Sequence, residues 1–155
     1  MAPYTVHEAV PSDRPFARKM LELAALQTYG DLAGLGRISL RERLDEIFER
    51  HYAHDRKRIW IAKAEEGLPV GLVWIQPGHH PVTEQPDYLV LNLAVELQHR
   101  GQGVARMLML SARAYAEGRG VRRLRLFVAA DNQPAVQLYE ALGFAERTRE
   151  MVWIF

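Results

Sequence analysis

The chain of 155 residues contains no cysteine. This absence excludes disulfide bonds, thiolate metal ligands and a cysteine nucleophile, and it is compatible with a cytoplasmic location. The sequence also lacks an apolar run of the roughly 20 residues that a membrane-spanning helix needs, and its first ten residues do not have the pattern of a secretory signal. We therefore expect a cytoplasmic protein without a membrane partner.

An excess of either charge is absent as well. The 20 Lys and Arg residues nearly balance the 19 Asp and Glu residues, and the net charge of +1 gives no indication of a nucleic-acid partner. Hydrophobic residues make up 48% of the chain, which is enough to form a core without metals or disulfides. The length is that of one domain, and no repeat or linker is visible, so we expect a single domain over residues 1–155.

Hydrophobic periodicity predicts an α/β fold, a mixed sheet with the element order β-α-α-β-β-β-α-β-α-β. Helices are expected over residues 15–28, 103–117 and 135–142. A further helix is expected to start at Leu40, because Ser39 and Glu42 form a capping box, and to end near residue 51. A glycine-rich, mobile connection at 29–37 and a loop at 77–87 complete the pattern. Strands are expected over residues 4–10, 59–64, 70–75, 88–95 and 124–128, with closing strand material at 144 and 151–155.

The stretch over residues 91–106, LNLAVELQHRGQGVAR, organises the chain. It starts as an apolar strand, passes through a polar turn that contains Gly101 and Gly103, and continues as a helix. The first N–H groups of a helix lack intrahelical partners and carry a partial positive charge, and glycine lets a phosphate approach the backbone closely. The turn therefore predicts an anion-binding site.

Three kinds of phosphate-binding loop compete for this turn. A nucleotide-triphosphate loop requires the pattern GxxxxGK[ST], which the sequence lacks. A dinucleotide-binding loop requires GxGxxG, and Arg106 stands where the third glycine is needed. The next strand also closes with Ala129 and Ala130 instead of the acidic residue that such a loop uses. An acyl-coenzyme A site is the third kind.

Two sequence blocks resemble the signature of the GNAT superfamily of N-acetyltransferases. Residues 98–103, QHRGQG, resemble the family pattern [QR]xxGx[GA], and Ala105 stands where another small residue is frequent. Alone, each block has a simpler explanation as a tight turn, a helix cap or a core aromatic residue. Together, in the family's order and spacing, they favour a functional site, and the resemblance covers nearly the whole chain. The second block, NxxAxxxYxxxGF, is matched by Asn132, Ala135, Tyr139, Gly143 and Phe144.

The resemblance implies a GNAT-like fold with acetyl-CoA as co-substrate and no metal. Backbone groups of the upstream strand, at Leu93, Ala94 and Val95, are expected to pair with the amide-bearing pantetheine arm. Asn132 is expected to hydrogen-bond the same arm. The pyrophosphate is expected on the turn and the start of the helix, at His99, Arg100, Gly101, Gln102, Gly103, Val104, Ala105 and Arg106.

The resemblance also assigns a role to Tyr139. Acetyl transfer from a thioester to an amine passes through an oxyanion and expels a thiolate of pKa about 8.5, so a phenol of pKa about 10 can donate the proton. Tyr139 matches the family position of this general acid, and the N–H of Val95 is a candidate to polarise the carbonyl. Because no acyl-cysteine can form, direct attack by the amine in a ternary complex is expected.

Neither the general base nor the acceptor follows from the sequence. The family often places a Glu on a central strand, but the corresponding positions, near Leu89 and Phe127, are apolar. The acceptor, a primary amine of a small molecule or a peptide, is expected beside the first two helices, with Tyr29, Asn92 and Glu84 as candidate contacts. A homodimer is compatible with these features. Candidates for the base are Glu84, Asp87, Asn92, Glu96 and the pair His79 and His80.

Two other hypotheses stay open. A non-catalytic acyl-CoA-binding module, which senses CoA or regulates a partner, is favoured by the missing carboxylate and disfavoured by the presence of Tyr139. An NAD-linked enzyme is the third hypothesis, and it predicts nicotinamide binding.

Overall fold

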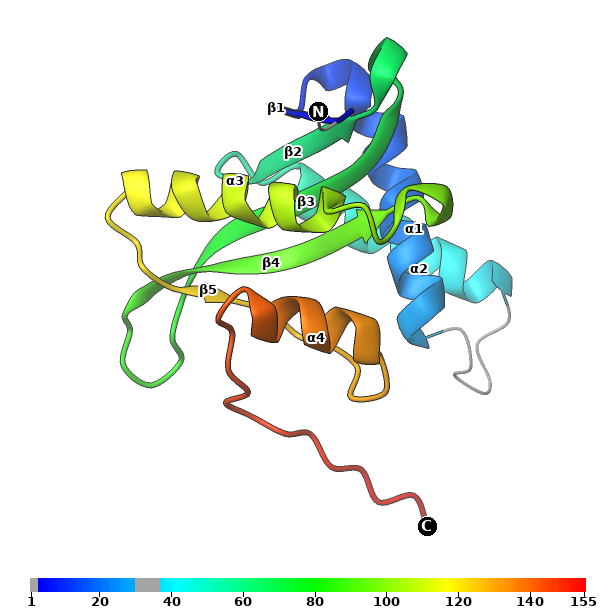
Figure 1. Ribbon diagram of the computed structural model, residues 1–155. Helices are drawn as coiled ribbons and strands as arrows, with labels where there is room; N and C mark the ends of the chain where they lie inside the picture. The colour runs from blue at the N-terminus through cyan, green and yellow to red at the C-terminus, as the bar shows by residue number, and fades with distance from the viewer. Residues whose placement is uncertain (1–2, 30–36) are drawn as a thin grey trace.

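A five-stranded sheet forms the centre of the computed structural model, which describes residues 3–29 and 37–155 (Figure 1). The strands lie in the order β1-β2-β3-β4-β5. The first four pair antiparallel, and β4 pairs with β5 in parallel because a helix crosses over between them. The strand bounds are β1 (Thr5–Glu8), β2 (Arg58–Lys63), β3 (Pro69–His79), β4 (Pro86–Val95) and β5 (Leu124–Arg125).

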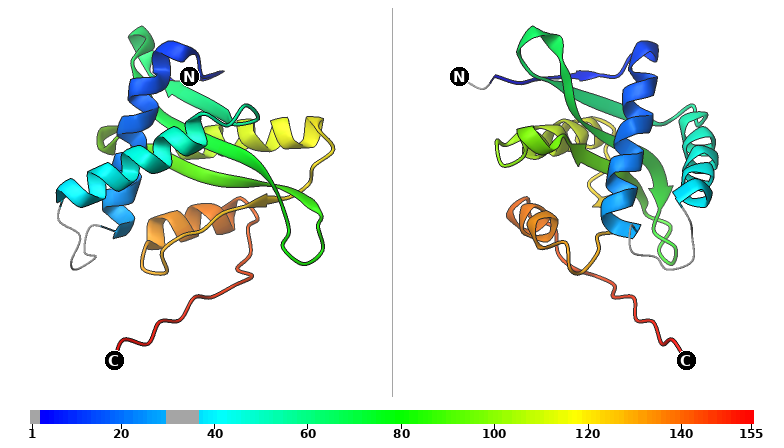
Figure 2. Two further views of the ribbon diagram at one scale, coloured as in Figure 1. Left: turned by 180° about the vertical axis from the view of Figure 1, so that it is seen from behind. Right: turned by 90° about the vertical axis from the view of Figure 1, so that its right-hand side faces the viewer.

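Helices cover both faces of the sheet. Figure 2 shows α1 (Arg14–Tyr29) and α2 (Arg37–Tyr52) on one face, and α3 (Val104–Gly118) and α4 (Gln133–Ala141) on the other. The predicted mixed α/β sheet with four helices is therefore confirmed. As a result, side chains on one face of β4 pack toward α1 and α2, and side chains on its other face pack toward α3.

Two hydrophobic cores follow from the alternation of side chains along β3. Leu72 and Trp74 point to the core beneath α1 and α2, and Val73 and Ile75 point to the core beneath α3. All four side chains are at most 1% exposed. Burying each such side chain contributes about 1.5–3 kcal/mol, so a continuous apolar strand is stable only between two helical layers.

The second helix begins earlier than predicted. α2 starts at Arg37, so the predicted start at Leu40 is wrong, and Ser39 lies inside the helix. A capping pattern marks a start only if the preceding residues leave the helical conformation, and here they stay helical. The expected mobile connection at 29–37 falls mostly on residues 30–36, which lie outside the described residues; its two flanking residues are helical.

The central hairpin is longer than predicted, because β3 and β4 extend into the segment predicted as a loop at 77–87. Pro77 lies within β3, opposite Tyr88. The N–H of Tyr88 donates to the carbonyl of Arg123 at 3.0 Å, on the β5 side, so the backbone groups of this residue pair face away from each other. β2 pairs with β3 only as far as Ile75, so no residue of β2 lies opposite Pro77. The N–H that proline lacks therefore costs no hydrogen bond between these strands.

Two predictions about the later strands are wrong. β5 consists of Leu124–Arg125 alone instead of residues 124–128, because its pairing with β4 stops at Leu89. The expected closing strand is absent: residues 145–155 form neither helix nor strand, and they run away from the sheet after α4 (Figure 1). Strand formation needs a partner strand, and in the described part of the chain this segment lies beside none.

Gly71 fixes how closely α3 approaches β3 and β4. A Cβ at this position would lie 3.0 Å from the carbonyl oxygen of Ala94 and 3.3 Å from a methyl group of Leu108. We expect Gly71→Ala to lower the free energy of unfolding by about 1–3 kcal/mol, through overpacking. Denaturant unfolding measures this change, and Gly118→Ala, where a Cβ meets nothing within 4 Å, is the matched control. Equal stability of the two variants would contradict the prediction.

Candidate functional site

β4 separates from β5 along most of its length. The two strands pair only at Tyr88–Leu124 and Leu89–Arg125. Beyond this point β4 carries a bulge, because Trp74 faces Asn92 while Ile75 faces Val90, which leaves Leu91 as the extra residue. Bulges bend a strand, so on the side of β5 the last residues of β4 lie beside a gap, while on the other side they pair with β3.

The backbone of β4 offers free polar groups to this gap. The N–H of Glu96 donates to the carbonyl of Val70 at 2.8 Å, and backbone direction alternates along a strand. The backbone N–H and C=O groups of Leu93 and Val95 therefore face the gap, whereas those of Ala94 face β3. The carbonyl of Val95 accepts a hydrogen bond from Arg100 Nε at 2.9 Å, and its N–H remains directed toward the gap. The structure thus presents a short unpaired strand edge at the predicted position.

The turn after β4 ends at the open N-terminus of α3. Gly101 and Gly103 have φ angles of 70° and 83°, a left-handed conformation that favours glycine. The first intrahelical hydrogen bond runs from the N–H of Met107 to the carbonyl of Gly103, so the N–H groups at 104–106 have no helical acceptor. The space around both glycines is open, since a Cβ on either would meet nothing within 4 Å. This geometry suits an anion.

A tyrosine far away in the sequence holds the turn. The buried Tyr4 donates its hydroxyl hydrogen to Gln102 Oε1 at 2.7 Å, and His99 Nδ1 lies 2.9 Å from the Tyr4 hydroxyl oxygen. Gln102 Nε2 also donates to the carbonyl of Gln98. Sequence reasoning placed His99 and Gln102 in the site but missed Tyr4. No local signal identifies it, because 95 residues separate it from His99.

α4 supplies the aromatic residue of the site. Asn132 caps this helix, with its Oδ1 accepting from the N–H of Ala135 at 3.4 Å, and its side-chain NH₂ group is left to donate. Tyr139 lies one to two turns further along, with its ring 5.6 Å from that of Phe144. Burial raises the pKa of Tyr139 above its ordinary value, so the phenol is protonated at neutral pH. In the view of Figure 1, α3 lies above β4 and α4 lies below it, both on the same face of the sheet.

A sequence model described as the Acetyltransferase (GNAT) family matches residues 19–144. This range includes the unpaired edge of β4, the glycine turn and Tyr139. The chain belongs to the GNAT acetyltransferase family.

Known proteins resemble this GNAT chain in sequence and in fold. N-acetyltransferase 8B of Homo sapiens is 29% identical over 107 residues, which make up 69% of this chain and 47% of that protein. The chain thus spans less than half the length of this relative. A Pyrococcus furiosus protein assigned as an acetyl transferase superposes with a TM-score of 0.82 at 24% identity, covering 98% of this chain and 99% of the other.

A Clostridium acetobutylicum protein, solved with acetyl-CoA and described as a predicted acetyltransferase, superposes with a TM-score of 0.74 at 17% identity. The superposition covers 97% of this chain and 96% of that one. At these identities the solved structures show the fold alone, and the fold is that of the GNAT family.

The face of β3 and β4 that lies toward α1 and α2 contains buried polar groups that have no hydrogen-bond partner among the described residues. Asn92 is 4% exposed, and its Nδ2 has no hydrogen-bond partner among the described residues; the same holds for Trp74 Nε1. Asn92 and Trp74 are cross-strand neighbours, so both lie toward α1 and α2. A small pocket opens next to them, between the two helices and the sheet, and it is lined by Leu21, Ile47, His51, Trp74 and Leu91.

His51 is the one ionisable side chain in the described lining of this pocket. Its Nδ1 lies 2.9 Å from Gln76 Oε1, and in the neutral tautomer whose Nδ1 donates to this oxygen, Nε2 is left as an acceptor. The sequence pattern predicts residue 51 as the approximate end of the second helix and gives it no role in the site. Its spacing of four residues from Ile47, which lines the same pocket, was the available signal.

Most other candidates for the base have structural partners. Asp87 is buried, with Oδ2 3.0 Å from Arg125 Nε, and Glu96 pairs with Lys19. His80 accepts the N–H of Thr83 at 3.0 Å within the hairpin turn. Glu84 is exposed in the same turn, away from the pocket, and Tyr29 is the last residue of α1, with a side chain outside the described part.

None of the described helices is both long and apolar enough to cross a membrane. Within residues 3–29 and 37–155, no three His, Asp or Glu side chains come together in a way that could hold a metal ion.

Removing the Tyr4 hydroxyl tests whether it organises the turn. We expect Tyr4→Phe to weaken coenzyme A binding by about fivefold, since one hydrogen bond contributes about 1 kcal/mol and His99 and Gln102 lose a shared partner. Calorimetric titration measures the affinity. Tyr52→Phe, in a ring that stacks on Phe48 away from the turn, is the matched control. If both variants bind with wild-type affinity, Tyr4 does not organise the site.

Proposed function

We propose that the protein is an acetyl-CoA-dependent N-acetyltransferase that acetylates a primary amine of a small molecule or a peptide. The observation that carries this proposal is the unpaired edge of β4 at Leu93 and Val95, which leads directly into the glycine turn and the open start of α3. An edge with free amides beside a helix N-terminus suits a ligand with an amide-bearing arm and a pyrophosphate. The acetyl-CoA held by the Clostridium acetobutylicum protein of the same fold supports this choice.

The donor is proposed to lie along β4 and the turn. The pantetheine amides extend the sheet at Leu93–Val95, and the NH₂ group of Asn132 donates to the same arm. The pyrophosphate binds the N–H groups from Gly101 to the first turn of α3. The exposed Arg106 adds positive charge there, while Arg100 is tied to the carbonyl of Val95 and positions the edge.

The chemistry needs two proton movements. The amine nitrogen attacks the thioester carbon, the new C–N bond forms, and the C–S bond breaks as the tetrahedral oxyanion collapses. The N–H of Val95 stabilises the oxyanion, and Tyr139 gives its proton to the departing thiolate. Because burial raises the Tyr139 pKa, the phenol keeps this proton until it is needed. Direct attack needs no covalent enzyme intermediate, in keeping with a chain without cysteine.

His51 is proposed to accept the proton of the amine. Gln76 fixes the tautomer in which Nε2 is the acceptor, and the pocket beside it lies on the α1 and α2 face. The pocket is lined by Leu21, Ile47 and Leu91, which favours an acceptor with an apolar group near its amine. Asn92 supplies an unpartnered NH₂ group next to this pocket and is proposed as a hydrogen-bond donor to the acceptor.

Release of free coenzyme A from acetyl-CoA, measured with a panel of small amines and N-terminal peptides, tests the function. The proposal expects release above background with at least one amine. Binding of acetyl-CoA without release from any amine would support a non-catalytic acyl-CoA-binding module instead.

The cytoplasmic location and the single domain over residues 1–155 stay predictions.

Tyr139→Phe separates the role in catalysis from the role in binding. Loss of the general acid is expected to lower kcat by about 10²-fold while the Kd for acetyl-CoA stays within about twofold, because the ring and its packing on Phe144 remain. Since the pKa of Tyr139 is raised, its deprotonation limits the wild-type rate only above the ordinary phenol value of about pH 10. Equal losses in kcat and affinity would contradict the general-acid role.

His51→Gln tests the proposed base. The variant is expected to lower kcat/KM by about 10²-fold and to leave acetyl-CoA affinity unchanged, because the donor lies on the other side of β4. His79→Gln, at an exposed histidine of the hairpin, is the control and should have wild-type kinetics. Wild-type kinetics for both variants would show that the amine proton leaves by another route.

A further inference from the structure

The carbonyl of Val95 is held by a side chain instead of a neighbouring strand. It faces the gap beside β4, and Arg100 Nε donates to it at 2.9 Å. The N–H of the same peptide group, that of Glu96, donates to the carbonyl of Val70 on β3 at 2.8 Å. This peptide group is therefore fixed on both sides. Because only two backbone dihedral angles separate it from the preceding peptide group, fixing it also restrains the N–H of Val95, the proposed oxyanion donor.

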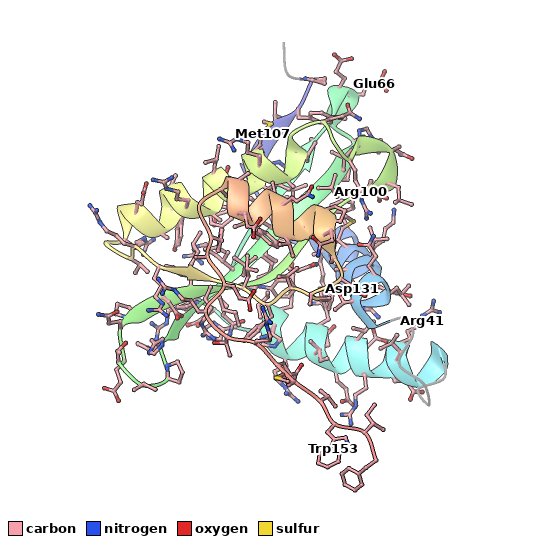
Figure 3. The ribbon with its side chains drawn as sticks, turned by 60° about the horizontal axis from the view of Figure 1, so that its bottom comes forward. Arg41, Glu66, Arg100, Met107, Asp131 and Trp153 are labelled. Carbon is pink, nitrogen blue, oxygen red and sulfur yellow. The ribbon has the colours of Figure 1, made fainter. Side chains whose placement is uncertain are left out.

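Arg100 is in turn held by α1. With the side-chain amide of Gln27 turned so that its oxygen faces the guanidinium, Gln27 Oε1 accepts from Nη1 at 2.7 Å and from Nη2 at 2.9 Å. The opposite orientation would direct the NH₂ group of the amide at the same donors, so the hydrogen bonds decide the orientation. Figure 3 shows Arg100 next to α1. One guanidinium thus links the last turn of α1 to the end of β4.

Both partners of Arg100 are neutral. A backbone carbonyl and an amide oxygen hold the guanidinium, and no carboxylate of the described residues lies within ion-pair distance of it. A carboxylate partner would compensate the charge of the guanidinium, whereas neutral acceptors leave that charge to act on other groups. Arg100 directly precedes Gly101 and the open start of α3. An uncompensated positive charge therefore lies next to the proposed pyrophosphate site.

The same helix compensates the carboxylate at this end of β4. Glu96, which follows Val95, pairs with Lys19 Nζ at 2.5 Å. Lys19 and Gln27 are eight residues apart, about 12 Å along α1. α1 therefore contributes a cation where the segment after β4 has a carboxylate, and a neutral oxygen where this segment has a cation. Both contacts keep the end of β4 positive.

We propose that Gln27 is a positioning residue of the donor site: its neutral oxygen holds Arg100 against the carbonyl of Val95 and leaves the guanidinium charge to the pyrophosphate of the donor. This role rests on the acetyl-CoA site proposed above, and it gives the acceptor-side helix α1 a part in donor binding. A glutamate at position 27 would keep the hydrogen bonds and compensate the charge. A leucine would keep the charge and release the guanidinium. Position and neutrality can therefore be separated by mutation.

Calorimetric titration with coenzyme A tests the role of neutrality. Gln27→Glu is expected to raise the Kd about fivefold, because the ligand loses an uncompensated charge, and to weaken the dependence of the Kd on salt concentration. Gln27→Leu keeps the charge and is expected to change the Kd by less than about twofold. Gln85→Glu and Gln85→Leu, at an exposed glutamine before β4, are the matched controls and should bind as the wild type does. Equal affinities of the two Gln27 variants would overturn the proposal.

Exchange of the Glu96 amide hydrogen tests the positioning. NMR is expected to show about fivefold faster exchange of this N–H in Gln27→Leu, because its peptide group loses one of its two supports, and wild-type exchange in Gln27→Glu. Arg100→Lys cannot form the three hydrogen bonds and should also exchange faster. If Gln27 acts through Arg100, adding Gln27→Leu to Arg100→Lys has no further effect. Additive effects, or unchanged exchange in Gln27→Leu, would overturn the proposal.

Failure of this proposal and failure of the proposed function give different results. A wild-type chain that binds no coenzyme A would refute the function, and the exchange of the Glu96 amide would still decide whether Gln27 positions Arg100. With an amine that the protein acetylates, Gln27→Leu is expected to lower kcat about fivefold, and Gln27→Glu is expected to raise the KM for acetyl-CoA at an unchanged kcat. The same loss of kcat in both variants would indicate a structural role alone and would overturn the proposal.

Discussion

The site depends on the fact that β4 and β5 are joined at one end and separated at the other. At the joined end the strands share two residue pairs, and the buried Asp87 of β4 binds Arg125 of β5 at 3.0 Å. A buried carboxylate without a charged partner is strongly disfavoured, so this contact holds the strands together. At the other end the bulge at Leu91 bends β4, and the N-terminus of α3 lies beside the gap. One ion pair and one extra residue thus determine where a ligand can insert.

The same separation presents one strand to both of the ligands that we propose for it. Backbone groups of Leu93 and Val95 face the gap between the strands, whereas the side chain of Asn92 faces α1 and α2. A donor that extends the sheet and an acceptor that approaches from the helical face would therefore meet across β4. Tyr139, the proposed acid, and His51, the proposed base, come from helices on opposite faces of the sheet, so each would serve one of the two substrates.

Much of this arrangement could be predicted from local patterns. Alternating and continuous apolar runs identified all five strands of the sheet, and the glycines at 101 and 103 identified the turn, because left-handed backbone favours glycine. Tyr4 and His51 could not be predicted in the same way. Tyr4 reaches His99 across 95 residues, and His51 meets Gln76 only because α2 packs on β3. The predicted start of α2 was also wrong. The predicted ends of β3 and β5 were wrong because the length of a strand depends on the neighbouring strand.

The sequence by itself determined the local parts of the proposed donor site: a strand, a glycine turn, a helix start, and a tyrosine on the following helix, each set by residues close together in the chain. Tertiary structure decided which strand edge is free, which side chains line the second face, and that the apolar C-terminal residues have no strand beside them in the described part of the chain. Local conformation follows from backbone preferences of neighbouring residues. Pairing, burial and the absence of a partner are properties of segments distant in sequence, so only the folded chain decides them.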